Sequence, residues 1–204
     1  MIDQEYKFIF VHIPRTGGTS IEKLLFKGSN DYKEWLGYNS EYKLFAQHAT
    51  IKQLKNELNV PVDDYFKFTI IRNPYERAVS DYFWLSKRKL SHPTSFKDYL
   101  LLRNGFEKLN HLRDETGRGD HFFTQFQFIE IEGKLEIDFI IRFENLQTDF
   151  NVVCDKIGIP KQQLPHDHKS KHKHYTEYYD DETKSIVAEK FSKDIEYFGY
   201  EFGK

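Results

Sequence analysis

Three short apolar segments set the pattern of the chain. Tyr6–Ile13 contains FIFVHI, and Tyr65–Arg72 reads YFKFTIIR. Continuous runs of this length, rich in β-branched and aromatic residues, are typical of strands buried on both faces, as in a parallel sheet. Leu135–Phe143, which contains DFIIRF, predicts a further strand after a turn at Gly133 and Lys134.

Helical patterns alternate with these strands. Thr19 and Ser20 open one of them, Thr50 is an N-cap candidate for a second, and Asn73 followed by Pro74 starts a third. The later helices are expected at 96–102, 144–157 and 180–198, the last as one continuous amphipathic helix. Because there is no repeat and no linker, we predict a single α/β domain over residues 1–204, with a central parallel sheet flanked by helices in three layers.

Composition narrows the class of protein. A chain of 204 residues has room for one full core, and its net charge of −2 argues against a nucleic-acid partner. The one cysteine, Cys154, permits no intrachain disulfide, which favours a reducing compartment. No apolar run has the length of a membrane span, and MIDQEYK is no signal peptide, so we expect a cytoplasmic protein without a membrane partner.

The first strand leads into HIPRTGGTS, residues 12–20. A strand, a glycine-bearing loop and a helix start together present backbone N–H groups that favour a phosphate or sulfate, and Gly17 and Gly18 let the backbone approach it. The segment is not a Walker A loop, because no GK[ST] follows, and an ordinary strand–helix turn is the alternative. The donors expected around the anion come from Arg15, Thr16, Gly17, Gly18, Thr19 and Ser20.

The second strand leads into RNPYERAVSDYF, which starts at Arg72. Ligands bind outside the carboxyl ends of strands in such sheets, so Arg72 and Ser80, two turns into the next helix, are expected to hold one phosphate. Arg77 shares a helix face with Ser80. The alternative is an exposed helix whose arginines pair with Glu76 and Asp81.

Taken together, the two segments resemble the carbohydrate-type sulfotransferases related to heparan sulfate 2-O-sulfotransferase. HIPRTGGTS is similar to their 5′-phosphosulfate loop, usually HIPKTGGTS, and RNPYERAVSDYF to their 3′-phosphate motif, an Arg and a Ser eight residues apart. DFIIRFENLQTDF and YYDDETKSIVAEKFSKDIEYFGYEF extend the resemblance over nearly the whole chain.

The resemblance implies a P-loop-like fold that binds 3′-phosphoadenosine 5′-phosphosulfate (PAPS), releases 3′,5′-ADP (PAP) and needs no metal. It implies that residues 15–20 hold the 5′-phosphosulfate and that Arg72 and Ser80 hold the 3′-phosphate. Arg15 stands where the family has lysine, so it can stabilise charge on the leaving group but cannot readily donate a proton. The expected enzyme is therefore a PAPS-dependent sulfotransferase acting on a hydroxyl acceptor.

A general base must take the proton of that hydroxyl. His48 is the candidate, because in the resembled family a histidine between the two phosphate motifs has this role. Glu22, one turn past the loop, is the rival, although a solvated helix-face carboxylate is the preferred interpretation. His12 is expected inside the strand, where it orients the loop.

Residues 161–174 are rich in lysine and histidine. A metal site at Asp167, His168 and His172 is disfavoured, because interleaved lysines would repel a cation. The family has a segment here that closes over the nucleotide, so Ser170 and Lys171 are weaker candidates for contacts with the donor.

The acceptor is less determined. Aromatic faces suit sugar rings, so a glycan acceptor is expected beside the aromatic-rich loop of Trp35, Tyr38 and Tyr42. If the acceptor is acidic, the candidates to bind it are Arg113, Arg118 and His121. The aromatic residues that could hold adenine are Tyr82, Phe83, Trp84, Phe122, Phe123 and Phe126.

Two other functions remain open. A P-loop phosphotransferase or kinase would need magnesium, and no carboxylate that could hold it follows a strand. A non-catalytic PAP(S)-binding protein on the same fold is the other alternative, which the arginine at position 15 keeps open.

Overall fold

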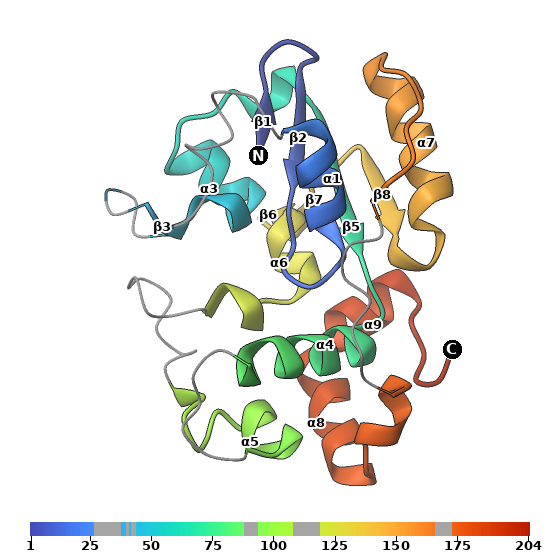
Figure 1. The fold of residues 1–204 in the computed structure, drawn as a ribbon. Helices are drawn as coiled ribbons and strands as arrows, with labels where there is room; N and C mark the ends of the chain where they lie inside the picture. Colours follow the sequence, from blue (N-terminus) through green and yellow to red (C-terminus); the bar gives the residue numbers. More distant parts are fainter. Residues whose placement is uncertain (27–37, 40, 42–43, 88–93, 108–118, 166–172) are drawn as a thin grey trace. The chain divides into compact units, whose positions relative to one another are not determined.

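Three strands of a four-stranded sheet lie in the predicted apolar runs, and the fourth, at Ile2–Asp3, was not predicted (Figure 1). In the computed structural model its order is β1-β2-β5-β8; the pairs β2–β5 and β5–β8 are parallel, and β1 is antiparallel at the edge. This confirms the α/β class with a central, mostly parallel sheet. The strands are β1 (Ile2–Asp3), β2 (Phe8–Val11), β5 (Phe66–Ile71) and β8 (Phe139–Arg142).

The structure describes residues 1–26, 38–39, 41, 44–87, 94–107, 119–165 and 173–204. The chain folds into two compact units. The first comprises residues 1–71 and 125–168, and the second comprises residues 72–124 and 169–204.

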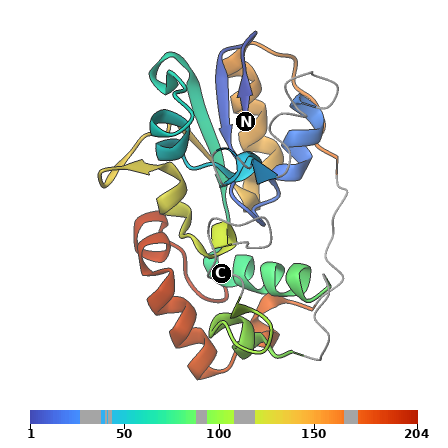
Figure 2. The same cartoon turned by 90° about the vertical axis from the view of Figure 1, so that its left-hand side faces the viewer.

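Helices cover both faces of the sheet in the first unit. Phe10 and Phe68 face α1 (Gly18–Leu25) and α7 (Leu146–Ile157), whose Cys154 is a fully buried core residue, as its sequence context predicts. Figure 2 shows α3 on the other side of the sheet. The first unit is therefore layered as helix, sheet and helix. Its remaining elements are β3 (Tyr38–Asn39), β4 (Leu44–Phe45), η1 (Ala46–His48), α3 (Ile51–Asn56), η2 (Val62–Asp64), α6 (Gln125–Ile129), β6 (Glu130–Ile131), β7 (Lys134–Leu135) and η5 (Phe143–Asn145).

Local signals fix the helix ends where the sequence predicts them. Thr50 caps α3 in a capping box with Gln53, and the side chain of Asn73 accepts from the backbone N–H of Tyr75 at the start of α4 (Pro74–Ser86). Gly158 ends α7 at φ 75°, a left-handed conformation that glycine adopts without strain.

The second unit packs its helices around an aromatic core. Its elements are α4 (Pro74–Ser86), α5 (Phe96–Leu100), η4 (Gly119–Phe122), η6 (Tyr175–Tyr178), α8 (Asp181–Lys190) and α9 (Ser192–Phe198).

The prediction of one continuous helix over 180–198 is wrong. α8 ends and α9 begins at Phe191, whose φ of −109° and ψ of 26° are not helical. Five residues along a straight helix turn by about 140°, so Phe191 would point away from the face that carries Ile186. The break lets Phe191 bury its ring in the aromatic core, where it is 3% exposed.

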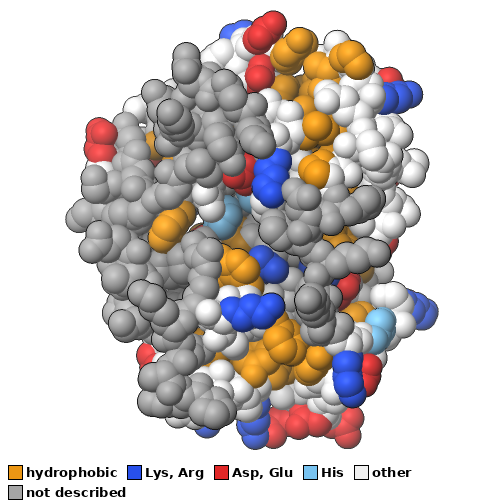
Figure 3. Space-filling view, viewed as in Figure 1, with side chains coloured by type: hydrophobic (Ala, Val, Ile, Leu, Met, Phe, Trp, Pro, Cys, Tyr) orange, Lys and Arg blue, Asp and Glu red, His pale blue; other side chains and the backbone are white. Residues whose placement is uncertain are grey.

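Among the described residues, every helix is too short or too polar to cross a bilayer. On the face seen in Figure 3, the described basic side chains are spread among apolar and acidic ones. That distribution agrees with a net charge close to zero.

Candidate active site

The loop after β2 has the backbone of an anion site. Arg15 and Gly17 have positive φ angles of 66° and 89°, and α1 begins at Gly18. The N-cap Gly17 offers no side-chain acceptor to the first N–H groups of α1. The N–H of Ser20 donates to the carbonyl of Gly17 at 3.2 Å, so the donors that remain for a ligand are the N–H groups of Gly18 and Thr19. Together with the helix dipole they suit a phosphate or sulfate.

Both glycines are required by their neighbours. A Cβ at Gly17 would lie 3.0 Å from Cε2 of Phe143, and one at Gly18 would lie 2.3 Å from Cδ2 of His12. The second distance is a clash, so the backbone of the loop can approach its surroundings only without side chains at these positions. The two glycines therefore let the loop pack directly against Phe143 and His12.

The three hydroxyls of the loop differ in what they bind. Thr16 is fully buried and donates to the carbonyl of Ile13 at 2.9 Å, and Ser20 donates to the carbonyl of Pro165 at 2.8 Å. The half-buried hydroxyl of Thr19 makes no hydrogen bond with the part of the chain that the structure describes. Of the three, Thr19 is therefore the hydroxyl best placed to donate to an anion.

His12 and Glu22 form a buried pair beside this loop. Nδ1 of His12 lies 3.0 Å from Oε2 of Glu22, and the two side chains are 6% and 8% exposed. The distance is that of an ion pair, although the direction is not that of a hydrogen bond. Glu22 is thus not the solvated carboxylate expected from the sequence, and His12 follows β2 instead of lying within it.

His48 lies at the end of η1 and is 7% exposed. Its ring packs edge to face on that of His12, with centroids 5.0 Å apart and an angle of 85°. Nε2 of His48 also lies 3.3 Å from the side-chain nitrogen of Gln47. His48, His12 and Glu22 therefore form one buried cluster, although they are far apart in sequence. The spacing of Gly18 and Glu22 on α1 is the signal that could have found it, since residues four apart share a helix face.

Arg72 and Ser80, in the second unit, are both buried. Nη2 of Arg72 donates to Oε1 of Glu76 at 2.7 Å, a pair that the alternative interpretation expects, but the arginines are buried and not on an exposed helix as that alternative has it. Arg77 instead donates to the backbone carbonyls of His121 and Phe123. Arg77 therefore holds the segment around His121 in place.

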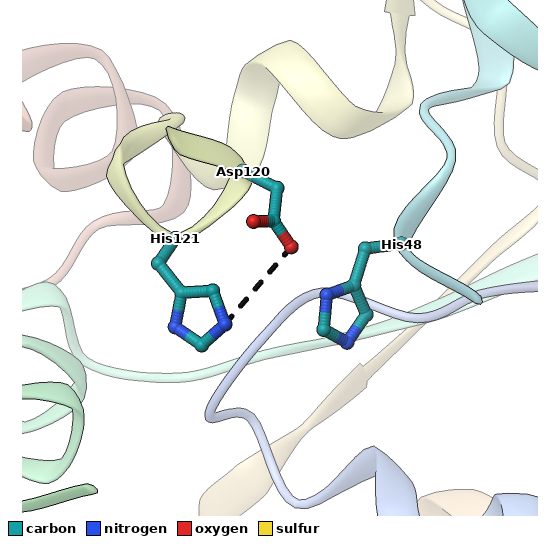
Figure 4. A group of neighbouring side chains, drawn as sticks. All are labelled: His48, Asp120 and His121. Carbon is teal, nitrogen blue, oxygen red and sulfur yellow. Dashed lines mark ion pairs between the residues drawn. The ribbon is translucent and has the colours of Figure 1, made fainter. Parts of the chain in front are cut away.

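Asp81 and His121 form a second buried pair, which sequence reasoning missed. Nδ1 of His121 lies 2.5 Å from Oδ1 of Asp81, whose other oxygen accepts from the hydroxyl of Tyr99 at 2.9 Å. Burial, reinforced by the carboxylate of Asp81, raises the pKa of Tyr99 well above its ordinary value and keeps it a donor. Figure 4 shows the ion pair of His121 with Asp120, at 4.0 Å, and draws His48 of the first unit as well.

Most aromatic candidates for adenine belong to cores. Tyr82, Phe83 and Phe122 pack in the second unit, Phe126 is buried in the first, and Trp84 stacks on His121 at 4.8 Å. Several other predicted residues lie outside the described part of the chain: Trp35, Tyr42, Arg113, Arg118, Asp167, His168, Ser170, Lys171 and His172.

The amine of Lys190 lies over an aromatic ring in the second unit. Its Nζ is 3.6 Å from the ring centroid of Phe122. Burial, and after it the charge of Arg77, lowers the pKa of Lys190 to about 8.

Comparison with known proteins decides the family. The model of a family described as "Sulfotransferase family" matches residues 1–201, which include both predicted phosphate segments. The chain belongs to this sulfotransferase family. The resemblance to sulfotransferases is thereby confirmed, and the family supports transfer of a sulfuryl group in general.

The chain is also similar to two individual proteins. An uncharacterized protein of Archaeoglobus fulgidus is 28% identical over 100 residues, which are 49% of this chain and 73% of that protein. The crystal structure of a sulfotransferase from Alicyclobacillus acidocaldarius aligns over 98% of this chain and 80% of its own, with a TM-score of 0.44 and 16% identity.

Proposed function

We propose that the protein takes the sulfuryl group of PAPS and gives it to a hydroxyl of a carbohydrate acceptor. The observation that carries this proposal is the loop at Pro14–Gly17, with two positive φ angles and an uncapped helix start at Gly18. Within the sulfotransferase family, such a loop suits the 5′-phosphosulfate. HIPRTGGTS favours the carbohydrate-type branch.

The residues of the loop would stabilise the leaving group. Bound PAPS supplies the sulfuryl group, whose sulfur exchanges its bond to the phosphate oxygen for one to the acceptor oxygen. The N–H groups at the start of α1 and the guanidinium of Arg15 neutralise the charge that remains on the phosphate of PAP. Thr19 adds a hydroxyl donor. Because Arg15 cannot readily give up a proton, its contribution is electrostatic.

His48 would take the proton of the acceptor hydroxyl. It is buried beside the loop region in the first unit, where a ring nitrogen can act as a general base. Arg72 and Ser80 would bind the 3′-phosphate, and Ser170 and Lys171 would contribute weaker contacts to the nucleotide. We further propose one functional domain, since the family model spans both units, and a cytoplasmic location, since Cys154 is a free thiol.

A second function has one observation in its favour. Arg15 replaces the lysine of the family, and a protein that binds PAP(S) without transferring the group would tolerate this change. Transfer distinguishes the two functions, because both include binding.

Thermal stabilisation by PAP, compared with ADP and ATP, tests the binding step. A ligand at about 100 times its Kd stabilises the folded state by about 2.7 kcal/mol. We expect PAP to raise the melting temperature, ADP to raise it less for want of the 3′-phosphate, and magnesium to be unnecessary. Stabilisation by ATP with magnesium and none by PAP would contradict the proposal and favour a phosphotransferase.

A further inference from the structure

The ring of His12 is held on four sides within the first unit. Phe10 stacks on it with centroids 5.4 Å apart and an angle of 19°, and His48 meets it nearly at a right angle. Gly18 lies so close that a Cβ there would clash with the ring, and Glu22 faces Nδ1. An imidazole enclosed in this way has one orientation.

Of the four described residues named around His12, Glu22 is the carboxylate, and burial makes its charge consequential. A buried carboxylate is costly unless it is paired, and its side chain, 8% exposed, has Nδ1 of His12 at 3.0 Å. Gly18 and Glu22 are four residues apart on α1, so the first turn of the helix presents both the contact and the charge to one ring. The same helix turn therefore forms the anion loop and fixes His12.

The orientation of His12 in turn limits that of His48. The edge-to-face contact at 5.0 Å and 85° allows a narrow range of ring positions for His48, which sits at the end of the short η1 helix. The capping box of Thr50 and Gln53 anchors the chain two residues further on. A base must hold its nitrogen within about 0.5 Å of the productive position, and packing of this kind provides that precision.

We propose that Glu22 and His12 are positioning residues for His48: Glu22 holds the ring of His12, and His12 holds the ring of His48 for proton transfer from the acceptor. This inference rests on the proposed function, because it assigns a role within the same reaction. It also gives a reason for a carboxylate buried next to the proposed anion loop.

Substitution of Glu22 separates positioning from binding. Glu22→Met keeps the length of the side chain but removes the partner of Nδ1, whereas Glu22→Gln keeps a polar group there. We expect Glu22→Met to lower kcat by up to about 100-fold, Glu22→Gln to lower it less, and both to leave the Kd for PAP within about threefold of wild type. Glu5→Met, at an exposed position of the same unit, is the control and should change neither.

A double variant tests the route through His48. If Glu22 acts only by way of His48, adding Glu22→Met to His48→Ala lowers kcat no further than His48→Ala alone. The inference would be overturned if the fold-losses of kcat in the two single variants multiplied in the double variant. An unchanged kcat in Glu22→Met would overturn it as well. Absence of transfer by the wild type would overturn the proposed function, and the catalytic role of the pair with it.

A measurement on the unsubstituted protein covers the case in which Glu22→Met does not fold. Nitrogen-15 spectra of labelled imidazoles should show one fixed protonation pattern for the two ring nitrogens of His12. Rapidly exchanging tautomers would show that the ring is not held, and would overturn the inference without any variant.

Discussion

Gly17 and Phe143 meet where the loop after β2 passes η5. The Cβ of an alanine at position 17 would lie 3.0 Å from Cε2 of Phe143, and φ there is 89°. The loop is therefore constrained twice, once by its own backbone conformation and once by a ring from a distant part of the sequence.

Gly17→Ala should be markedly destabilising. Strain at positive φ and overpacking each cost about 1–3 kcal/mol. The loss of unfolding free energy should therefore be larger at Gly17 than for an alanine substitution at a glycine of similar φ that has open space around it. Gly133 is that control: its φ is 81° and no atom lies within 4 Å of its Cβ position. Urea unfolding of both alanine variants measures the difference, and equal losses would mean that Phe143 does not constrain the loop.

The hydroxyls of Thr16 and Thr19 should have separable effects. Thr16→Val removes the donor to the carbonyl of Ile13 and should cost about 1–2 kcal/mol of unfolding free energy. Thr19→Val should leave stability nearly unchanged and weaken PAP binding by about 3- to 10-fold, the value of one lost hydrogen bond. Unfolding curves and calorimetric titrations of both variants measure these two effects. If Thr19→Val binds PAP as tightly as the wild type, Thr19 does not have the proposed role.

The second unit offers a test of the buried pair of Asp81 and His121. Tyr99→Phe removes one hydrogen bond to the carboxylate of Asp81 and should lower the free energy of unfolding by about 1–3 kcal/mol, since the partner is charged and buried. Tyr197, 58% exposed, is the matched position, and its change to Phe should cost less than about 0.5 kcal/mol. Similar values for the two variants would contradict the network.

Lys190 predicts a pH dependence of stability. Its pKa is lowered from 10.5 to about 8, so the unfolded chain binds more protons between these values and stability rises with pH through that window. Lys190→Met removes the cost of burying the charge. It should therefore stabilise the protein most below pH 8, and progressively less up to about pH 10.5. Unfolding at pH 7 and pH 10 measures this, with Lys134→Met as the exposed control; a pH-independent difference would contradict it.

The sequence predicts the sheet well because its signals are local. The runs at β2 and β5 are apolar on both faces, and the caps Thr50 and Asn73 act within three residues. The continuous helix over 180–198 was a wrong prediction, because only packing around Phe191 breaks it.

The site is harder to predict because its partners are distant in sequence. The motifs locate the loop, but they do not tell that Ser20 donates to Pro165 or that Glu22 is buried against His12. A carboxylate on an amphipathic helix is usually solvated. Glu22 is buried because it lies against His12, which follows β2 and belongs to another element.

Transfer of a labelled sulfuryl group from PAPS to an acceptor is the direct measurement of the proposed reaction. With EDTA present and a panel of glycans and small alcohols as acceptors, the account predicts that label moves to a hydroxyl acceptor and PAP is released. It also predicts that His48→Ala loses about 10²- to 10⁴-fold in rate while its affinity for PAP is kept. Tight binding of PAP by the wild type without transfer to any acceptor would contradict the account.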